Sequence, residues 1–130
     1  HTSPPPITNL GDSTVSVITT ATGAVSAPIT VGKKPEKVAV TPDGKHAYVT
    51  NRGDGTVSVI TTATFAVSAP INVGKTPEMV AITPDGKQAY VANFGNGTVS
   101  VITTATGAVS APIAVGSPVG MAICSEPSTQ

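Results

Sequence analysis

The chain has 130 residues, and its 7 basic and 7 acidic residues leave no formal net charge. Without a net positive field, we do not expect electrostatic binding of nucleic acid or of an anionic membrane. Aromatic residues make up only 3% of the sequence, which argues against the stacked rings that hold single-stranded nucleic acid. No apolar run approaches the roughly 20 residues of a membrane-spanning helix. Nucleic-acid binding and membrane insertion are therefore both excluded from the expected functions.

The composition favours strands over helices. Val, Ile and Thr are abundant, whereas Leu10 is the only leucine. β-Branched side chains lose rotamer freedom in a helix but fit a pleated surface. The single cysteine, Cys124, rules out an intrachain disulfide and is expected to be a buried structural thiol. The scarcity of charge, at 11%, suits a protein at the cell surface, outside the cell or in the periplasm.

One segment recurs three times along the chain. The run TVSVITTAT begins at Thr14, at Thr56 and at Thr98, and each copy continues through AVSAPI to VG. Successive copies are therefore 42 residues apart. A fixed period of this length is typical of repeat architectures, in which one supersecondary unit stacks on copies of itself.

Turn residues divide one repeat into four expected strands. Pro42 followed by Asp43 and Gly44 predicts a tight turn, and the glycine-rich segment 51–55 predicts another. A third turn is expected at 62–65. The strands between these turns are expected at 37–41, 46–50, 56–61 and about 66–73. Consecutive short strands with tight connections predict an antiparallel meander.

The prolines order the strands within a unit. Pro28, Pro70 and Pro112 recur in the fourth strand, and proline cannot donate a hydrogen bond to a neighbouring strand. Proline is tolerated at a sheet edge, so the fourth strand should be outermost and the first innermost. A four-stranded meander repeated about every 40–45 residues predicts the blade of a β-propeller. The predicted fold class is all-β, with four-stranded antiparallel blades.

The residues also carry a family resemblance. The run Tyr48-Val49-Thr50-Asn51 and its counterpart Tyr90-Val91-Ala92-Asn93 each follow a Pro-Asp-Gly-Lys turn and precede GTVSVI. This pattern resembles the YVTN-type β-propeller repeat of archaeal surface-layer proteins and exported bacterial proteins. The resemblance implies a propeller that acts as a binding or structural protein at a surface or in the periplasm. The family offers no shared catalytic residues.

The alignment of repeats predicts that the chain begins inside a blade. The segment 7–9 aligns with 49–51, so the first blade lacks its first strand, and three prolines at 4–6 delay its second strand to about Ile7. The segment 118–124 matches a lone first strand. The predicted units are a partial blade at 13–32, blades at 35–74 and 77–116, and a closing strand at 118–124, which gives 3+4+4+1 strands or three blades.

Three blades are too few to close a ring, because propellers use about four to eight. We therefore expect closure by self-association, in which two chains form a six-bladed homodimer; a trimer would give nine blades. The strand that completes the partner's first blade is expected to be Val119, Gly120, Met121, Ala122, Ile123 and Cys124. The alternative is that the chain is a fragment of a longer propeller.

Antiparallel topology gathers two sets of loops on one face. The connections from fourth to first strand and from second to third strand share this face, where propellers commonly bind ligands near the central channel. We expect a partner-binding rim there, for a protein or glycan ligand. Its candidate residues are Lys33, Lys34, Glu36, Arg52, Asp54, Lys75, Glu78, Phe94 and Asn96.

No catalytic or metal-binding pattern stands out. Asp43 and Asp85 recur in tight turns, where turn capping explains them. His1 and His46 are the only histidines and have no accompanying ligand cluster, so neither a metal nor a cofactor is expected. Arg52-Gly53-Asp54 spells an integrin-binding tripeptide, but it occurs in only one of the three equivalent loops. A turn without that function is the simpler interpretation.

Three functions follow from these patterns. The main expectation is a non-catalytic scaffold that binds protein or glycan partners at the cell surface. Near-identical repeats would place the same side chains around the channel, which favours a scaffold over an asymmetric active site. The alternatives are a fragment of a larger propeller, for example an enzyme with an active site in the channel, and a duplicated or consensus repeat protein without an evolved ligand.

Overall fold

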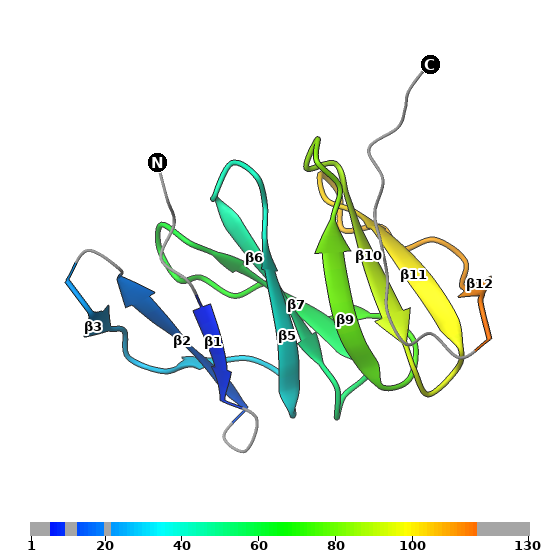
Figure 1. Ribbon diagram of the computed structural model, residues 1–130, viewed down its shortest axis with the longest axis horizontal. Coiled ribbons are helices and arrows are strands. Elements are labelled where there is room, and N and C mark those ends of the chain that lie inside the picture. The colour runs from blue at the N-terminus through cyan, green and yellow to red at the C-terminus, as the bar shows by residue number, and fades with distance from the viewer. Residues whose placement is uncertain (1–5, 10–12, 20–21, 117–130) are drawn as a thin grey trace.

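The computed structural model describes residues 6–9, 13–19 and 22–116, and over these residues the chain is all-β. The twelve strands form three antiparallel sheets of four strands each, which stand side by side as three blades (Figure 1). The described part of the chain contains no helix, and hence no helix long and apolar enough to cross a membrane. The predicted propeller-type fold with four-stranded blades is confirmed.

Blades 2 and 3 are meanders in chain order. Blade 1 consists of β1 (Pro6–Asn9), β2 (Thr14–Thr19), β3 (Ala24–Val25) and β4 (Ile29–Thr30), and both β3 and β4 pair with β2. Blade 2 consists of β5 (Pro35–Val40), β6 (His46–Asn51), β7 (Thr56–Thr61) and β8 (Ile71–Asn72). Blade 3 consists of β9 (Pro77–Ile82), β10 (Gln88–Asn93), β11 (Thr98–Thr103) and β12 (Ile113–Ala114). The second and third strands agree with the turn-based prediction to within one residue.

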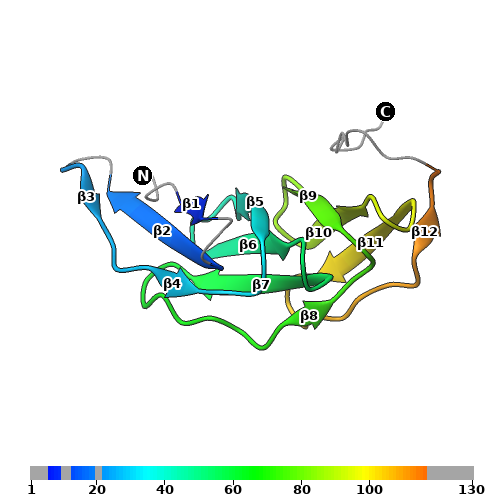
Figure 2. The ribbon, with the colours of Figure 1, turned by 90° about the horizontal axis from the view of Figure 1, so that it is seen from below.

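The blades radiate from one side of the molecule. Figure 2 shows β1, β5 and β9 along one side, with β4 and β8 along the opposite side. β5 packs beside β9, and β1 packs beside β5. The first strands of blades 2 and 3 are therefore innermost, as the prolines predict.

The fourth strand is shorter than expected. In blade 2 it is reduced to β8, with an isolated bridge between Ile60 and Val67 farther along. Between these two pieces, Ser68 Oγ accepts a hydrogen bond from Val59 N at 3.1 Å. Pro70 follows and has no N–H to donate. The proline prediction identified the outer edge correctly, but a hydroxyl and a proline interrupt the strand there.

The core lies between the blades, and the two faces of β6 divide it. Ala47 and Val49 pack toward blade 1 against Val15, Val17 and Ile29. Tyr48, on the opposite face of the same strand, packs with Val57 against Ala89, Val91 and Ile102 of blade 3. Alternate residues of a strand point to opposite faces, so one strand supplies both interfaces. Apolar burial between neighbours thus holds the blades together.

Candidate functional site

The loops at the end where β5 and β9 begin form a continuous surface, which we call the loop rim: residues 32–36, 51–55, 74–78 and 93–97. Neighbouring loops are hydrogen-bonded to each other through their backbones. Arg52 N donates to Lys34 O, and Gly53 N donates to Lys33 O, each at 2.9 Å. The same pair of bonds recurs from Phe94 N to Thr76 O and from Gly95 N to Lys75 O, each at 3.0 Å. In each of these two blades, the loop after the second strand thereby holds the loop that leads into the first strand.

A buried asparagine lies against each loop pair. Asn51 is fully buried at the end of β6, and its Oδ1 accepts a hydrogen bond from Gly32 N at 3.1 Å. Its Nδ2 donates to Thr56 Oγ1 at 3.0 Å and to Ser58 Oγ at 2.9 Å. The equivalent Asn93 donates to Thr98 and Ser100 in the same way. We call this arrangement the asparagine clasp. At Asn51 its hydrogen bonds join the loop of one blade to the core of the next, whereas Asn93 bonds only within its own blade.

The clasp leaves no room for a side chain on the loop it holds. A Cβ on Gly32 would lie 2.6 Å from Cγ of Asn51, and one on Gly74 would lie 2.7 Å from Cγ of Asn93. Such distances are below normal contact, so these two positions require glycine. The one difference between the clasps is that Asn93 Oδ1 is buried without a hydrogen-bond partner.

An ion pair crosses from blade 2 to blade 3 on the rim. Arg52 Nε donates to Glu78 Oε2 at 3.1 Å, with side chains 40% and 30% exposed. This bond uses one of the five N–H donors of the guanidinium. At the junction of blades 1 and 2 the equivalent residues are Leu10 and Glu36, so the sequence offers no arginine there. The pair makes this blade junction chemically distinct.

Part of the rim backbone is strained. Lys34 and Thr76 occupy equivalent positions with φ angles of 52° and 53°. A side chain in this left-handed region costs about 1–2 kcal/mol, and β-branched residues such as threonine are rare there. Strain of this kind clusters at functional sites.

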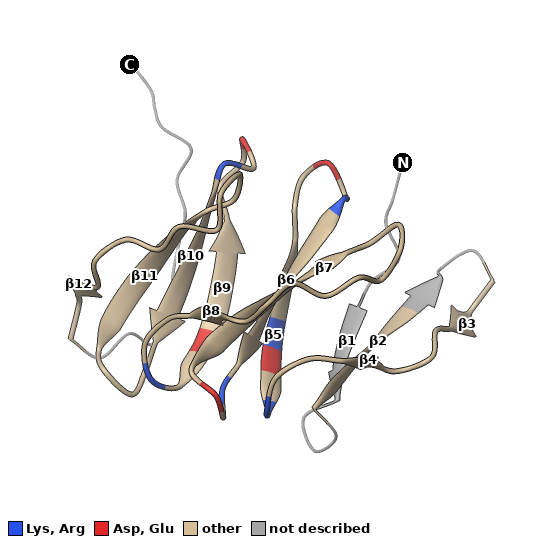
Figure 3. Cartoon of the chain, turned by 180° about the vertical axis from the view of Figure 1, so that it is seen from behind, with Lys and Arg blue, Asp and Glu red and all other residues tan. Residues whose placement is uncertain are grey.

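The structure brings most of the predicted rim residues together in pairs. Arg52 pairs with Glu78, Lys33 N donates to Asp54 Oδ2 at 2.9 Å, and Lys75 N donates to Asn96 Oδ1. Charged residues gather at the two ends of the blades, and the rim is one of them (Figure 3). Lys34 is exposed, Glu36 and Phe94 are half-buried, and the predicted closing strand at 119–124 lies outside the described residues.

The RGD tripeptide is not presented as a free loop. The carboxylate of Asp54 accepts from Lys33 N, and the guanidinium of Arg52 bonds to Glu78. Both charged ends of the tripeptide are thus engaged within the protein, which agrees with its interpretation as a turn.

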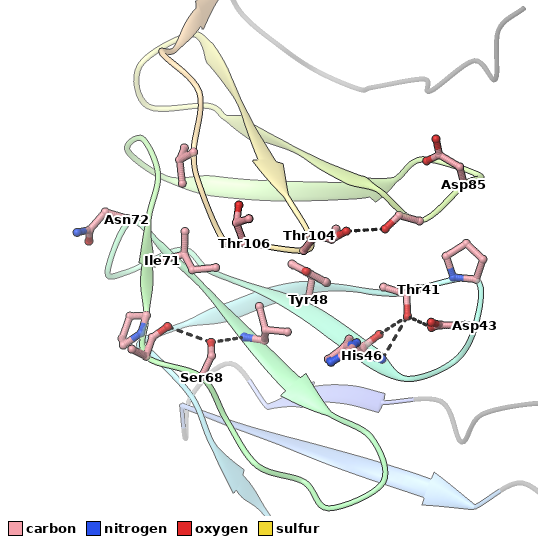
Figure 4. A pocket seen from close by; sticks show the side chains of 18 residues that line it. Thr41, Asp43, His46, Tyr48, Ser68, Ile71, Asn72, Asp85, Thr104 and Thr106 are labelled. Atoms are coloured by element: carbon pink, nitrogen blue, oxygen red, sulfur yellow. Dashed lines mark hydrogen bonds between the residues drawn. The ribbon is translucent and has the colours of Figure 1, made fainter.

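A groove runs between blades 2 and 3, from the turns opposite the rim along the outer strand of blade 2. We call it the inter-blade groove; its volume is about 900 Å³. Figure 4 shows side chains from both blades facing each other across it. Its polar lining includes Thr41, Asp43, His46, Ser68, Asn72, Asp85, Thr104 and Thr106. Val59, Ile71 and Val109 add apolar surface.

Two aspartates of the groove are fixed in their turns. Asp43 Oδ1 accepts from Thr41 Oγ1 at 2.6 Å and from Lys45 N at 2.9 Å. These bonds, the one from Thr41 first, lower the pKa of Asp43 below its usual 3.8. Asp85 has the equivalent bonds from Thr83 and Lys87, and its pKa is lowered in the same way. Both groups are therefore carboxylates at neutral pH. No cluster of three metal-ligating side chains occurs among the described residues.

The rim is also where the repeats differ in charge. Residues 35–74 and 77–116 differ at eight aligned positions. In this alignment Arg52 corresponds to Phe94, Asp54 corresponds to Asn96, and Lys37 corresponds to Met79. The expectation that near-identical repeats place identical side chains around the channel is therefore wrong for the loops. The remaining differences are Val40/Ile82, His46/Gln88, Thr50/Ala92, Phe65/Gly107 and Asn72/Ala114.

Four-stranded antiparallel sheets arranged around their first strands define the β-propeller class of proteins. Residues 8–119 match the family model described as "Lactonase, 7-bladed beta-propeller". The chain belongs to this family. The propeller part of the resemblance predicted from the sequence is thus confirmed, and the family shown is the lactonase family.

Solved structures agree on the fold. Hydrazine synthase of Kuenenia stuttgartiensis is 33% identical, with a TM-score of 0.82 over 86% of this chain and 32% of that chain. A candidate 6-phosphogluconolactonase from Bacteroides fragilis is 23% identical, with a TM-score of 0.70 over 88% of this chain and 36% of that chain. Virginiamycin B lyase from Staphylococcus aureus is 15% identical, with a TM-score of 0.73 over 90% and 41%. This chain thus spans about a third of the length of these proteins. No curated protein gives a significant sequence match.

These findings correct the expected function. The lactonase family match contradicts both the expected non-catalytic scaffold and the expectation that the chain is not part of an enzyme. The alternative of a fragment of an enzymatic propeller agrees better with the family. The physical reason for the error is that the repeats are alike in their strands but not in the rim loops that surround the channel.

Sequence reasoning missed two features of this site. Asn51 and Asn93 were interpreted only as turn residues, although each is a buried clasp. The groove was missed because its residues come from turns 42 positions apart. The recurrence of Asn before each Gly-containing loop was a signal for the buried asparagines. No sequence signal marks the groove.

Proposed function

We propose that this chain supplies blades to a lactone-hydrolysing propeller enzyme and that its reacting groups lie on the loop rim. The observation that carries the proposal is the Arg52–Glu78 pair, which joins two blades at 3.1 Å and occurs at one blade junction. The lactonase family match supports the reaction class, and the 6-phosphogluconolactonase-like neighbour suggests a sugar-acid lactone as substrate.

The rim offers the two kinds of group that lactone hydrolysis uses. In this reaction a water oxygen bonds to the carbonyl carbon, the ring C–O bond breaks, and the ring oxygen leaves with a proton to give a hydroxy acid. In the proposed reaction, the guanidinium of Arg52 stabilises the negative charge that develops on the carbonyl oxygen. The carboxylate of Glu78 accepts a proton from the attacking water.

The charge of the rim fits an acidic substrate. Lys33, Lys34 and Lys75 lie on the loop rim with Arg52 and are exposed. Cationic side chains on one loop surface attract and orient carboxylate or phosphate groups. The backbone pairing of the loops holds these positions fixed, which favours preorganised binding.

The test measures acid release from gluconolactone and its 6-phosphate in a pH-stat with the full chain. Substitution of Arg52 by Leu, the residue at the equivalent position 10, should lower kcat/KM about 100-fold. Lys45→Ala, at the opposite end of the blades, is the matched control and should retain the activity. Hydrolysis at the uncatalysed rate, or an Arg52→Leu variant as active as the parent chain, contradicts the proposal.

Three finer expectations remain predictions beside this proposal. The Tyr-Val-Thr-Asn repeat type rests on the runs at 48–51 and 90–93. A place outside the cytoplasm rests on the low charge of the chain. Self-association rests on the number of blades and on exposed apolar surface, which is discussed below.

A further inference from the structure

We infer that the inter-blade groove is a second binding site, separate from the rim, for a neutral polyhydroxylated ligand such as a sugar ring. This inference does not depend on the proposed lactonase activity. It rests on the volume, the charge and the chemistry of the groove, and on one residue difference between repeats. Its volume of about 900 Å³ lies within the range of small-molecule sites.

The charge of the lining selects the class of ligand. Among the residues that line the groove, Asp43 and Asp85 are carboxylates, and none is Lys or Arg. Carboxylates repel phosphate and carboxylate ligands, so an anion is disfavoured here. The rim differs in charge, because it carries four cationic side chains beside three carboxylates: Lys33, Lys34, Arg52 and Lys75 beside Glu36, Asp54 and Glu78. The rim and the groove therefore suit different ligands.

The hydrogen-bonding groups fit hydroxyl groups of a ligand. In Asp43 and Asp85, Oδ1 accepts the hydrogen bonds made within the turn, so Oδ2 remains as an acceptor for a ligand. Thr106 Oγ1 accepts from Ala108 N and can still donate its proton. Carboxylates, hydroxyls and an imidazole that face one space can bind several hydroxyls at once (Figure 4).

Apolar surface lies beside these polar groups. Ile71 and Val59 of blade 2 and Val109 of blade 3 line the same space, and Tyr48 lies at its base. A sugar ring presents hydroxyls at its edge and C–H groups on its faces. A lining with both kinds of surface is complementary to such a ring, since polar groups fix the orientation of a ligand while apolar contacts supply area.

One glycine keeps the groove open. Gly107 lines it, has a φ of +77°, and has no atom within 4 Å of the position that a Cβ would take. The equivalent residue of blade 2 is Phe65, which adopts a φ of 64°. The same turn thus accepts phenylalanine in one blade and glycine in the other. A side chain at position 107 would occupy space in the groove without requiring a new backbone conformation.

The test is an amide chemical-shift titration of the full chain with methyl glycosides of glucose, galactose, mannose and N-acetylglucosamine, each to about 20 mM. We expect shifts at residues 43–46 and 104–107 for at least one glycoside, with a dissociation constant of about 1 mM. Gluconate is the anionic control and should leave these amides unchanged. The absence of shifts for all four glycosides, or equal shifts with gluconate, overturns the inference.

Variants locate the site. Gly107→Phe should weaken glycoside binding at least about tenfold, whereas Phe65→Gly, the matched exchange in blade 2, should not change it. Asp85→Asn keeps the acceptor of the turn but removes the charge, and it should weaken binding several-fold; it replaces Gly107→Phe if that variant does not fold. Binding unaffected by Gly107→Phe and Asp85→Asn, or equally weakened by Phe65→Gly, overturns the inference.

Discussion

At the scale of single residues, Asn51 joins two blades with one side chain. Its amide accepts from a loop of blade 1 and donates to two hydroxyls of blade 2, and the residue is fully buried. A buried polar group contributes stability only while its hydrogen bonds are intact. Breaking the clasp is therefore expected to lower stability, and the intact clasp holds the rim loop in one position.

Replacement of Asn51 by Ala should lower the free energy of unfolding by about 2–3 kcal/mol, because the N–H of Gly32 and the two hydroxyls lose their partner. Urea unfolding followed by circular dichroism measures the loss. Asn72→Ala is the control, since Asn72 is exposed and blade 3 has Ala114 in its place. A difference between the two variants below about 0.5 kcal/mol would show that the clasp is not a stabilising contact.

The sequence predicted where residues lie in the fold better than it predicted which contacts they make. The strand expected at 46–50 is confirmed, and the structure adds that both of its faces are buried, because successive side chains point to opposite neighbours. Arg52 was assigned to the right loop, but its partner Glu78 belongs to another blade. A contact between repeats depends on their rotation about the axis, and a linear sequence does not encode that angle in any local pattern.

At the scale of elements, the β5–β6 turn shows how a repeated motif sets a pKa. Thr41 and the backbone of Lys45 stabilise the charged form of Asp43, which lowers its pKa below 3.8 in the folded chain. A lowered folded-state pKa contributes stability above the unfolded value. That contribution is lost as the pH falls from about 3.8 through the lowered pKa.

Removal of the hydroxyl should reverse part of this effect. In Thr41→Val, the pKa of Asp43 should rise toward 3.8, because the bond that lowers it most is absent. Carboxyl carbon shifts followed by NMR between neutral and acidic pH measure it. Thr83→Val should raise the pKa of Asp85 and leave that of Asp43 unchanged. An unchanged Asp43 titration in Thr41→Val would contradict the assigned cause.

The outer strand was the least predictable element. Its pattern of apolar residues suggests a strand over 66–73, but β8 spans only two residues. Ser68 takes a hydrogen bond that a backbone carbonyl would take in a regular ladder, and Pro70 supplies none. Both effects depend on which side of the strand faces its neighbour, so the sequence indicates a weakened strand without giving its length.

At the scale of the whole molecule, equivalent residues show which face has no neighbouring blade among the described residues. Ile29 is 8% exposed against blade 2, and Ile71 is half-buried against blade 3. Ile113 is 48% exposed and Val115 is 47% exposed on the free side of blade 3. The same residue types cover an interface in two blades and face solvent in the third, so this face is shaped for another blade of the same kind.

We predict that the isolated chain self-associates through this face. Native mass spectrometry should give a mass of two chains, the six-bladed arrangement expected from the sequence, or of a larger multiple. Ile113→Lys should shift the population to single chains, because a charge buried against another blade is unfavourable. Ala63→Lys, in an exposed turn, should not. A parent chain that already has the mass of one chain would contradict the prediction.

The way in which the rim loops are held has a consequence for how such proteins diversify. Main-chain hydrogen bonds and a closely packed glycine fix the path of each loop, and a buried amide adds a bond to one of them, so the path does not depend on which side chains the loop displays. Arg52 and Phe94 can therefore stand at equivalent places without altering the ring. After duplication of a repeat, each copy is free to acquire its own surface chemistry, and exchange of loops between copies would redistribute that chemistry around the axis while the scaffold stays the same.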